Sequence, residues 1–221
     1  MIERVYESVL KCQQFKQVVV ATDDERIANC VHSFGGNVVM TRNDHQSGTD
    51  RIAEAAQQLP ATDVIVNIQG DEPFIRAVQL DQVCAFFRDP TVDIATLAHP
   101  LNELDRILDA NVVKVAMTAS GRALYFSRSP IPYLRGIPQE EWPSTQKYFQ
   151  HLGIYAYRSK ILAQLTELPP SPLEQAESLE QLRWLEAGYS IYVGITPHKS
   201  IGVDTPADLA QAEFLLKQRD A

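Results

Sequence analysis

Length, composition and charge narrow the classes of protein to which this chain can belong. Its 221 residues are enough for one large domain, and its apolar share of 45% and charged share of 22% are ordinary for a globular protein. A formal net charge of −8 argues against nonspecific nucleic-acid binding, which needs a basic face, but leaves room for a small anionic ligand in a local pocket. We recognise neither a signal peptide nor an apolar run of membrane-spanning length, so we expect a cytoplasmic protein without membrane insertion.

The cysteine content supports the same compartment. Cys12, Cys30 and Cys84 are odd in number, lack metal-ligand spacing and fall in helix-like apolar patterns. We therefore expect buried free thiols in a reducing cytoplasm.

The first third of the chain alternates helices with strands. Apolar residues at helical spacing predict a helix over 2–10, and a polar loop is expected over 41–48. Asp23 or Asp24 is placed to cap a second helix. The expected strands are 17–22, 37–40 and 64–68, with a further helix over 49–59.

The rest of the chain continues this rhythm and then breaks it. A helix that buries Val78, Val83 and Phe87 precedes further predicted strands and helices. The expected strands are 92–97, 112–117, 123–127, 152–157 and 189–196, and the expected helices are 174–187 and one starting at Thr205. The alternation predicts a single α/β domain over 1–221, with a mostly parallel sheet flanked by helices. The long loop between the strands at 123–127 and 152–157 indicates an inserted lobe over about 123–157.

Acidic side chains follow two apolar segments. The β-branched run 64–68 ends in Gln69, Asp71 and Glu72, at the carboxyl end of a strand, where open α/β sheets bind ligands. Asp204 follows another apolar segment. Each carboxylate beside a triphosphate would be repelled by roughly 4 kcal/mol at about 4 Å, so pairing Asp71 with Asp204 indicates Mg²⁺ between protein and phosphate. The alternatives are an acidic turn at 71–72 and a helix cap at Asp204.

Two further groups of polar residues are candidates for ligand contacts. Arg42 and Ser47 lie in the polar loop at the same sheet edge and could read a base, or form an exposed loop in which Ser47 or Thr49 caps the next helix. Arg128 suits carboxylate recognition, with a surface salt bridge as the alternative. The remaining candidates could line a sugar pocket or be ordinary strand and helix polar groups: His151, Tyr155, Glu180 and Gln181.

Seven segments, taken in order, resemble the 3-deoxy-manno-octulosonate cytidylyltransferase (CMP-Kdo synthetase) family. They are VATDDERI (20–27), TRNDHQSGTDRIAE (41–54), NIQGDEPFI (67–75), ALYFSRSPIPY (123–133), HLGIYAYR (151–158), EQAESLEQLRWLEAG (174–188) and GVDTPADL (202–209). The resemblance implies a nucleotidyltransferase-type α/β fold. It also implies Mg²⁺-dependent transfer of CMP from CTP to the sugar acid 3-deoxy-manno-octulosonate (Kdo), with release of pyrophosphate, for lipopolysaccharide synthesis.

The resemblance also implies roles for the candidate residues. Asp71 and Asp204 correspond to the metal ligands, and Arg42 and Ser47 to the cytosine side. Gln69 corresponds to a contact shared by nucleotide and sugar. The sugar-acid pocket corresponds to Arg128, His151, Tyr155, Glu180 and Gln181. A homodimer joined through the 123–157 lobe is implied as well.

One part of the family pattern is missing. The family's opening strand and its loop of the form P-A-R-x-x-S-x-R-L-P-G-K-P-L have no counterpart here, since residues 1–5 match the helix that follows that loop. We therefore expect weak triphosphate binding and unpaired ladder groups on the strands beside the missing one. A cytidylyltransferase for another sugar acid such as sialic acid, a noncatalytic remnant and a metal-dependent glycosyltransferase remain alternatives.

Overall fold

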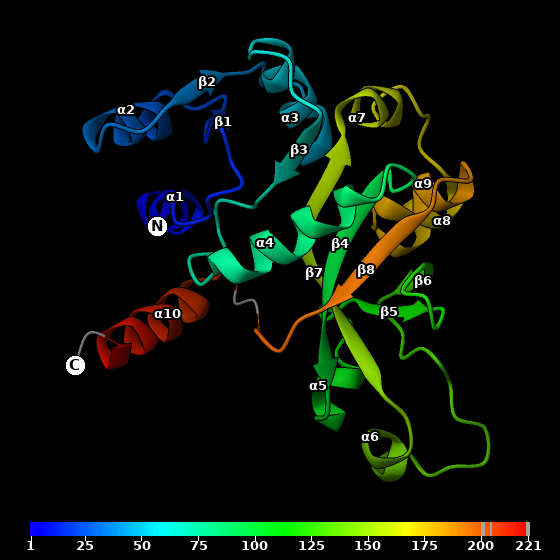
Figure 1. The fold of residues 1–221 in the computed structure, drawn as a ribbon. Coiled ribbons are helices and arrows are strands. Elements are labelled where there is room, and N and C mark those ends of the chain that lie inside the picture. The colour runs from blue at the N-terminus through cyan, green and yellow to red at the C-terminus, as the bar shows by residue number, and fades with distance from the viewer. Residues whose placement is uncertain (200–201, 204, 220–221) are drawn as a thin grey trace.

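The computed structural model describes residues 1–199, 202–203 and 205–219, and Figure 1 shows their arrangement. The strands are β1 (Val20–Thr22), β2 (Val38–Met40), β3 (Val64–Asn67), β4 (Ile94–Leu101), β5 (Lys114–Met117), β6 (Ala123–Ser127), β7 (Tyr148–Arg158) and β8 (Ile191–Ile195). The α-helices are α1 (Ile2–Leu10), α2 (Glu25–Ser33), α3 (Gly48–Gln57), α4 (Ala77–Ala85), α5 (Leu104–Leu108), α6 (Trp142–Thr145), α7 (Ser159–Leu165), α8 (Pro172–Glu177), α9 (Gln181–Glu186) and α10 (Pro206–Arg219). Two short 3₁₀ helices, η1 and η2, cover Phe86–Arg88 and Gln139–Glu141.

The long strand β7 organises a six-stranded sheet. Its second half lies between β3 and β4 and is antiparallel to both, whereas β8 pairs in parallel with the far side of β4. The first half of β7 pairs with β4 and, at Gln150, with β5, which in turn pairs antiparallel with β6. Strands β3, β4 and β8 therefore point the same way, as βαβ units require, but the antiparallel β7 makes the sheet mixed.

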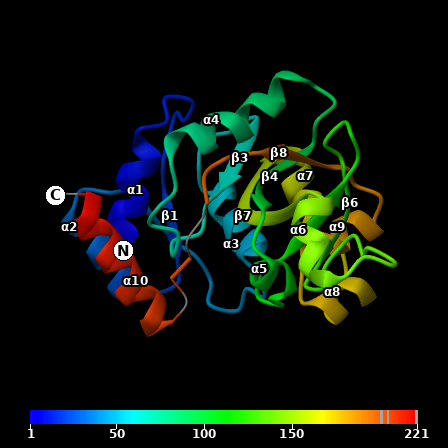
Figure 2. The same ribbon diagram turned by 90° about the horizontal axis from the view of Figure 1, so that it is seen from below.

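Both faces of this sheet are covered by helices. Alternate side chains of β4 point to opposite faces, so Ile94 and Ala98 join one core while Ala95 and Leu97 join the other. The first core includes residues of α3, α7 and α9, and the second includes residues of α1 and α4. Figure 2 shows α4 on one side of the sheet and α3 on the other. This layering confirms the α/β class predicted from the alternating pattern.

Strands β1 and β2 form a separate parallel pair beside α2. Asp24 caps α2 by accepting a hydrogen bond from the Arg26 backbone N–H at 2.8 Å, which decides between the two predicted caps. Among the described residues, β1 pairs only with β2 and β3 only with β7. Figure 1 shows the β1–β2 pair apart from the six-stranded sheet.

The helix predicted over 174–187 is wrong in one respect: it is two helices. A left-handed Ser178, with φ of 51°, ends α8 and separates it from α9. Arg128 satisfies the carbonyls at this corner, since Nε donates to Glu177 O at 2.7 Å and Nη2 lies 3.4 Å from Ser178 O. Because Arg128 lies about fifty positions from this break in the sequence, the local pattern of residues 174–187 could not predict it.

Two other expectations also need correction. Strands β4 and β7 are longer than predicted because their extra residues, Ala98–Leu101 and Tyr148–His151, pair with each other. Cys12 is buried as expected, but Cys30 is exposed on α2. All three cysteines are free thiols.

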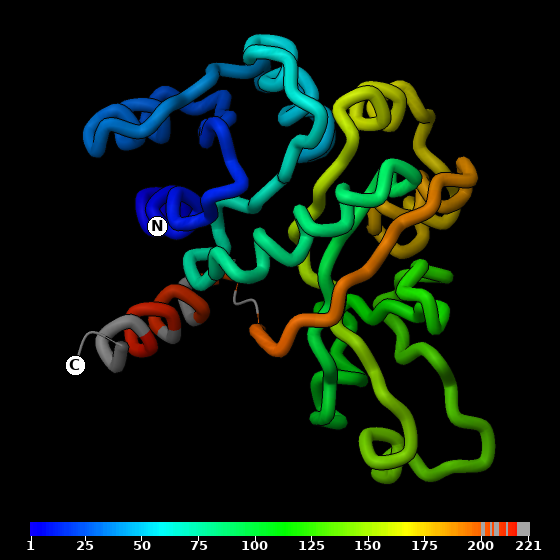
Figure 3. The backbone as a smooth tube through the Cα atoms, in the orientation of Figure 1, coloured from blue at the N-terminus to red at the C-terminus, as the bar shows by residue number. Residues whose placement is uncertain are grey.

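Residues 128–147 leave the sheet after β6 and return at β7. Figure 3 shows this segment projecting away from the sheet, with the short helix α6 within it. Trp142 is 1% exposed and stacks on Tyr148, with ring centroids 6.2 Å apart. Tyr133 packs edge-on against Trp142, with ring centroids 5.3 Å apart, and is 72% exposed. Strands β6 and β7 belong to the main sheet, so only the segment between them projects.

Among the residues described, no helix has the length and apolarity needed to cross a membrane.

Candidate active site

The turn after β3 carries the acidic motif predicted to bind ligand. The chain reverses where the Glu72 backbone N–H donates to Gln69 O at 3.3 Å. Helix α1 lies against this turn, since a methyl group added at Gly70 would stand 3.2 Å from Ile2 Cδ1. The Val203 backbone N–H donates to Asp71 O at 2.9 Å, which joins the 202–203 segment to the turn. Asp204, predicted as the second metal ligand, lies outside the described residues.

Gln69 lies between two glycines that come from different elements. Methyl groups added at Gly48 and Gly153 would stand 3.6 Å from its Nε2 and 3.8 Å from its Cγ. Gly48 begins α3, whereas Gly153 lies in β7. The Gln69 side chain therefore lies where the end of β3, the start of α3 and the middle of β7 meet.

Strand β7 is irregular at this meeting point. Its register against β4 shifts, because Thr96 faces Tyr155 whereas the next residue, Leu97, faces Leu152. Gly153 and Ile154 are the extra residues, so β7 has a bulge beside Gln69. Bulges redirect side chains and are common next to active sites.

His151 and Tyr155 flank the bulge. The His151 ring packs edge-on against Phe126 with centroids 5.0 Å apart, and lies 5.2 Å from the Tyr155 ring. Burial among these groups lowers the pKa of the imidazole to about 3, so His151 is neutral near pH 7. Burial also raises the pKa of Tyr155 well above its ordinary value. Its hydroxyl has no hydrogen-bond partner within the described part of the chain.

Glu180 meets the start of α3 from the other side of the site. Its Oε2 accepts a hydrogen bond from the Thr49 hydroxyl at 2.8 Å. Burial raises the pKa of this carboxyl, and the hydroxyls of Thr49 and Ser47 oppose that rise. Ser47 also caps α3 by accepting from the Asp50 N–H at 3.1 Å, so its predicted cap role is confirmed. The neighbouring Gln181 is buried at the start of α9.

Arg128 lies at the far side of the α8–α9 corner. Its guanidinium donates to the carbonyls of Glu177, Ala110 and Ser178 at 2.7, 3.1 and 3.4 Å. The Glu177 carboxylate accepts from the Ser127 hydroxyl at 2.6 Å and from the Arg128 backbone N–H at 2.9 Å. In this arrangement Arg128 fixes the corner that carries Glu180, rather than forming the surface salt bridge given as its alternative.

A buried lysine, Lys114, binds the backbone of Arg128, whose side chain holds the α8–α9 corner. Lys114 is fully buried, and its ammonium donates to the carbonyls of Val112 at 2.7 Å, Asp109 at 2.8 Å and Arg128. Burial lowers its pKa. Three carbonyl acceptors match the three donors of an ammonium group, so the charge is fully solvated by backbone.

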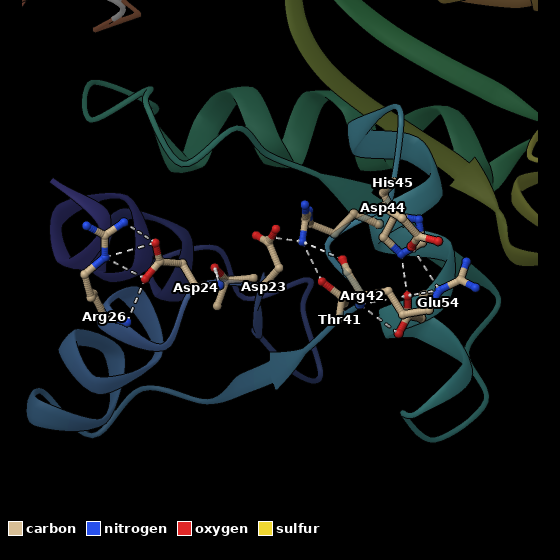
Figure 4. A network of polar contacts seen from close by, with 10 residues as sticks. Asp23, Asp24, Arg26, Thr41, Arg42, Asp44, His45 and Glu54 are labelled. Atoms are coloured by element: carbon tan, nitrogen blue, oxygen red, sulfur yellow. Dashed lines mark hydrogen bonds and ion pairs between the residues drawn. The ribbon is translucent and has the colours of Figure 1, made fainter.

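Arg42 belongs to a separate polar network, which Figure 4 shows. Its backbone N–H donates to the Glu54 carboxylate at 3.2 and 3.3 Å, and its Nε lies 3.5 Å from Glu54 and 3.4 Å from Asp44. His45 also binds Glu54 through Nε2. Helix α3 is therefore bonded to two other parts of the chain. Glu54 binds the 41–48 loop, and Thr49 binds Glu180. The Arg42 side chain is 69% exposed, so a ligand can reach it.

Several of the predicted residues thus gather in one place, and two others lie apart from it. Gln69, His151, Tyr155 and Glu180 gather around the β7 bulge and the start of α3, with Ser47 beside them. Arg42 lies in the loop behind α3, and Arg128 on the other side of the α8–α9 corner.

The sequence reasoning missed Thr49, Thr96 and Glu177. Thr49 was predicted only as an alternative cap. Its hydrogen bond to Glu180 spans 131 positions of the chain, so no local signal reveals it.

The fold places the chain in a broad class. A crystal structure of 4-diphosphocytidyl-2C-methyl-D-erythritol synthase from Anaerococcus prevotii matches with a TM-score of 0.62 at 12% identity, over 98% of this chain and 88% of that one. At this identity the match concerns the fold alone. The chain therefore has the nucleotidyltransferase-type α/β fold.

Sequence comparisons define the family within that class. The profile of the family described as Cytidylyltransferase matches residues 1–195. The 3-deoxy-manno-octulosonate cytidylyltransferase of Bacteroides thetaiotaomicron is 52% identical over 99% of this chain and 88% of its own length. A structure of CMP:2-keto-3-deoxy-manno-octonic acid synthetase complexed with CTP matches with a TM-score of 0.91 and 43% identity, over 99% of this chain and 88% of that one. The chain belongs to the 3-deoxy-manno-octulosonate cytidylyltransferase family, as its motifs predicted.

The lowered pKa of His151 predicts an acid-dependent loss of stability. Its folded-state pKa of about 3 lies below the ordinary value of 6.5, so the folded state binds the proton less readily than the unfolded state. Above pH 6.5 the His151 ring is neutral in both the folded and the unfolded state. As the pH falls from 6.5 toward 3, the unfolded state takes up a proton that the folded state does not bind, and the free energy of unfolding therefore decreases. We expect His151→Gln to lose less stability than the unchanged protein between neutral pH and about pH 5, as measured by urea unfolding.

The matched control for this measurement is His32→Gln, which alters an exposed histidine on α2 and should follow the unchanged protein. Equal acid sensitivity in His151→Gln and the unchanged protein would contradict the assignment.

Proposed function

We propose that this chain transfers CMP from CTP to Kdo, giving CMP-Kdo and pyrophosphate for lipopolysaccharide synthesis. The observation that carries the proposal is the match over 99% of the chain, at a TM-score of 0.91, to a CMP-Kdo synthetase complexed with CTP. In this reaction the anomeric hydroxyl oxygen of Kdo bonds to the α-phosphorus of CTP, the bond to the β-phosphate oxygen breaks, and the hydroxyl proton is released. The protein mainly aligns the reactants and balances their charge.

The residues around the β7 bulge suit the sugar acid. His151 is neutral and Glu180 offers a half-buried carboxyl group, so both can take hydrogen bonds from sugar hydroxyls. Gln69 lies between the elements that carry Ser47 and His151, which supports a shared contact with nucleotide and sugar. Tyr155 and Gln181 complete this group. Arg42 supports the nucleotide side from its exposed position in the 41–48 loop.

Arg128 takes an additional role in this proposal. Its guanidinium has five N–H donors and spends three of them on the carbonyls of Glu177, Ala110 and Ser178, so the second N–H groups of Nη1 and Nη2 remain for the sugar carboxylate. Its existing bonds already serve the pocket by fixing the helix that begins after Glu180.

The acidic turn fits a magnesium ion. Asp71 supplies a carboxylate of the kind that Mg²⁺ prefers. The Val203 backbone N–H bonds to Asp71 O, and Val203 is the residue that precedes Asp204 in the sequence. No cluster of three or more metal-binding side chains occurs among the described residues, and Mg²⁺ shared with phosphate does not need one. Bound there with Asp71 and Asp204, the ion would neutralise phosphate charge and favour loss of pyrophosphate.

The free thiols support a cytoplasmic site of action, since a reducing compartment keeps such cysteines unpaired.

The direct test of this function is pyrophosphate release. We expect release to require CTP, Kdo and Mg²⁺ together, to stop when a chelator removes the metal, and to return when Mg²⁺ is restored in excess. Sialic acid in place of Kdo should give little release. Release with sialic acid but not with Kdo would assign the alternative sugar acid, and the absence of release with either would support the noncatalytic alternative.

Asp71→Asn tests the role of the acidic turn. Because the negative charge is needed chiefly as the transition state forms, we expect kcat to fall about 100-fold or more while the Kd for CTP changes far less. Calorimetry gives the binding constant. Asp63→Asn is a matched control, because this exposed residue precedes the opposite end of β3. Undiminished turnover in Asp71→Asn would refute the role.

We also propose that the chain forms a homodimer through the 123–157 region. The region exposes large apolar side chains, among them Tyr133 at 72%, Leu124 at 58% and Ile137 at 36%. Large apolar side chains that are exposed in one chain can be buried at an interface with a second copy. Sedimentation should give twice the chain mass of 24.8 kDa, and Tyr133→Ser should shift the equilibrium toward monomer.

Ile27→Ser, which removes an exposed apolar side chain from α2, serves as the control and should leave the dimer intact. A monomer at all protein concentrations would reject the interface.

A further inference from the structure

Thr96 is a buried hydroxyl with no assigned role. It lies in β4, is 0% exposed, and faces β7 where the bulge begins. A β-branched residue suits a strand, but a hydroxyl at a fully buried position must find hydrogen-bond partners there.

The Thr96 hydroxyl has three partners around the bulge. Its Oγ1 lies 2.7 Å from Ile154 O, 3.1 Å from Leu152 O and 3.2 Å from His151 Nε2. A hydroxyl has one proton to donate and two lone pairs to accept with. Both carbonyl oxygens can only accept, so the single proton is directed to them, and the 2.7 Å distance is typical of an O–H···O bond. The hydroxyl must therefore accept from His151.

This assignment fixes the tautomer of His151. If Thr96 accepts, Nε2 must carry the ring proton, and the other nitrogen, Nδ1, must be unprotonated in the neutral ring. No described residue hydrogen-bonds to Nδ1. The ring packs between Phe126 and Tyr155, which disfavours a second proton and the positive charge that it would bring.

We propose that Thr96 is a positioning residue that holds His151 as the Nε2-protonated tautomer, so that Nδ1 accepts a hydrogen bond from a hydroxyl group of the sugar acid. This inference rests on the proposed function for the identity of the ligand, but not for the tautomer itself. It also assigns a chemical class to the contact. A lone pair at Nδ1 attracts a hydroxyl donor and repels a carboxylate, so His151 does not bind the acid group of the substrate.

The tautomer can be tested without substrate. Two-bond ¹H–¹⁵N correlation spectra of the histidine rings distinguish the two neutral tautomers, and His151→Gln identifies the His151 signals. We expect the unchanged protein and Thr96→Ser to show an Nε2-protonated ring, because serine keeps the hydroxyl. Thr96→Val should show a mixture of tautomers. An Nδ1-protonated ring in the unchanged protein, or an unaltered pattern in Thr96→Val, would overturn the proposal.

Kinetics test the consequence for the substrate. Loss of one aligned hydrogen bond predicts that Thr96→Val raises the KM for Kdo roughly 3- to 10-fold while the KM for CTP changes less than about 2-fold. Thr96→Ser should restore the KM for Kdo. Thr166→Val, which removes an exposed hydroxyl at the end of α7, is the control and should change neither value. Equal increases in both KM values would mean that Thr96 only maintains the fold, and would reject a positioning role.

The two proposals fail in different ways. If the proposed function is wrong, the unchanged protein releases no pyrophosphate with Kdo, yet its His151 spectrum still reports the tautomer. If only the positioning proposal is wrong, release is normal and the spectrum shows the other tautomer or no response to Thr96→Val.

Discussion

The site depends on one interruption of the hydrogen-bond ladder between β4 and β7. A regular ladder would pair β7 with β4 residue by residue, but the two extra residues at Gly153 and Ile154 break that pairing without changing the alternation of faces, since Leu152, Ile154 and Ala156 all join one core. At this interruption Gly153 lies beside Gln69, and His151 lies beside the Thr96 hydroxyl. Thr96 in turn satisfies backbone carbonyls around the bulge. The same buried hydroxyl therefore stabilises the irregular backbone and orients a side chain of the candidate site.

Around this bulge, buried polar groups are held by partners from distant parts of the chain. Glu180 depends on Thr49 of α3, and the corner that presents it depends on Arg128 and Lys114 from the neighbourhood of β5 and β6. Each of these groups is costly to bury alone, by about 1–3 kcal/mol for a neutral group and more for a charge. Because the bonds are mutual, the α8–α9 corner, the start of α3 and the sheet constrain one another. Such a network keeps the side chains around the bulge in place before any ligand binds.

The local sequence pattern predicted correctly those elements whose formation depends on neighbouring residues. The Val64–Asn67 strand, the Asp24 and Ser47 caps and the helical spacing of residues 2–10 all follow from side chains within a few positions, and the structure confirms them. Pattern failed where a distant partner decides. The sequence pattern predicted one helix where α8 and α9 are separated at Ser178, and it predicted β4 and β7 as shorter strands than they are. In each case the decisive contact comes from another element: the Arg128 guanidinium at the corner, and the pairing of Ala98–Leu101 with Tyr148–His151.

By itself the sequence determined the α/β class, the family and the kind of side chain at each strand end, because these depend on residue type, order and short-range spacing. Only the tertiary structure decided which of those side chains meet. It brought Gln69 between Gly48 and Gly153, directed Arg128 to backbone carbonyls and set Arg42 behind α3. It also made His151 a neutral ring of one tautomer. Protonation and hydrogen-bond roles depend on burial and on the nearest polar atoms, and the fold supplies both from residues far apart in the chain.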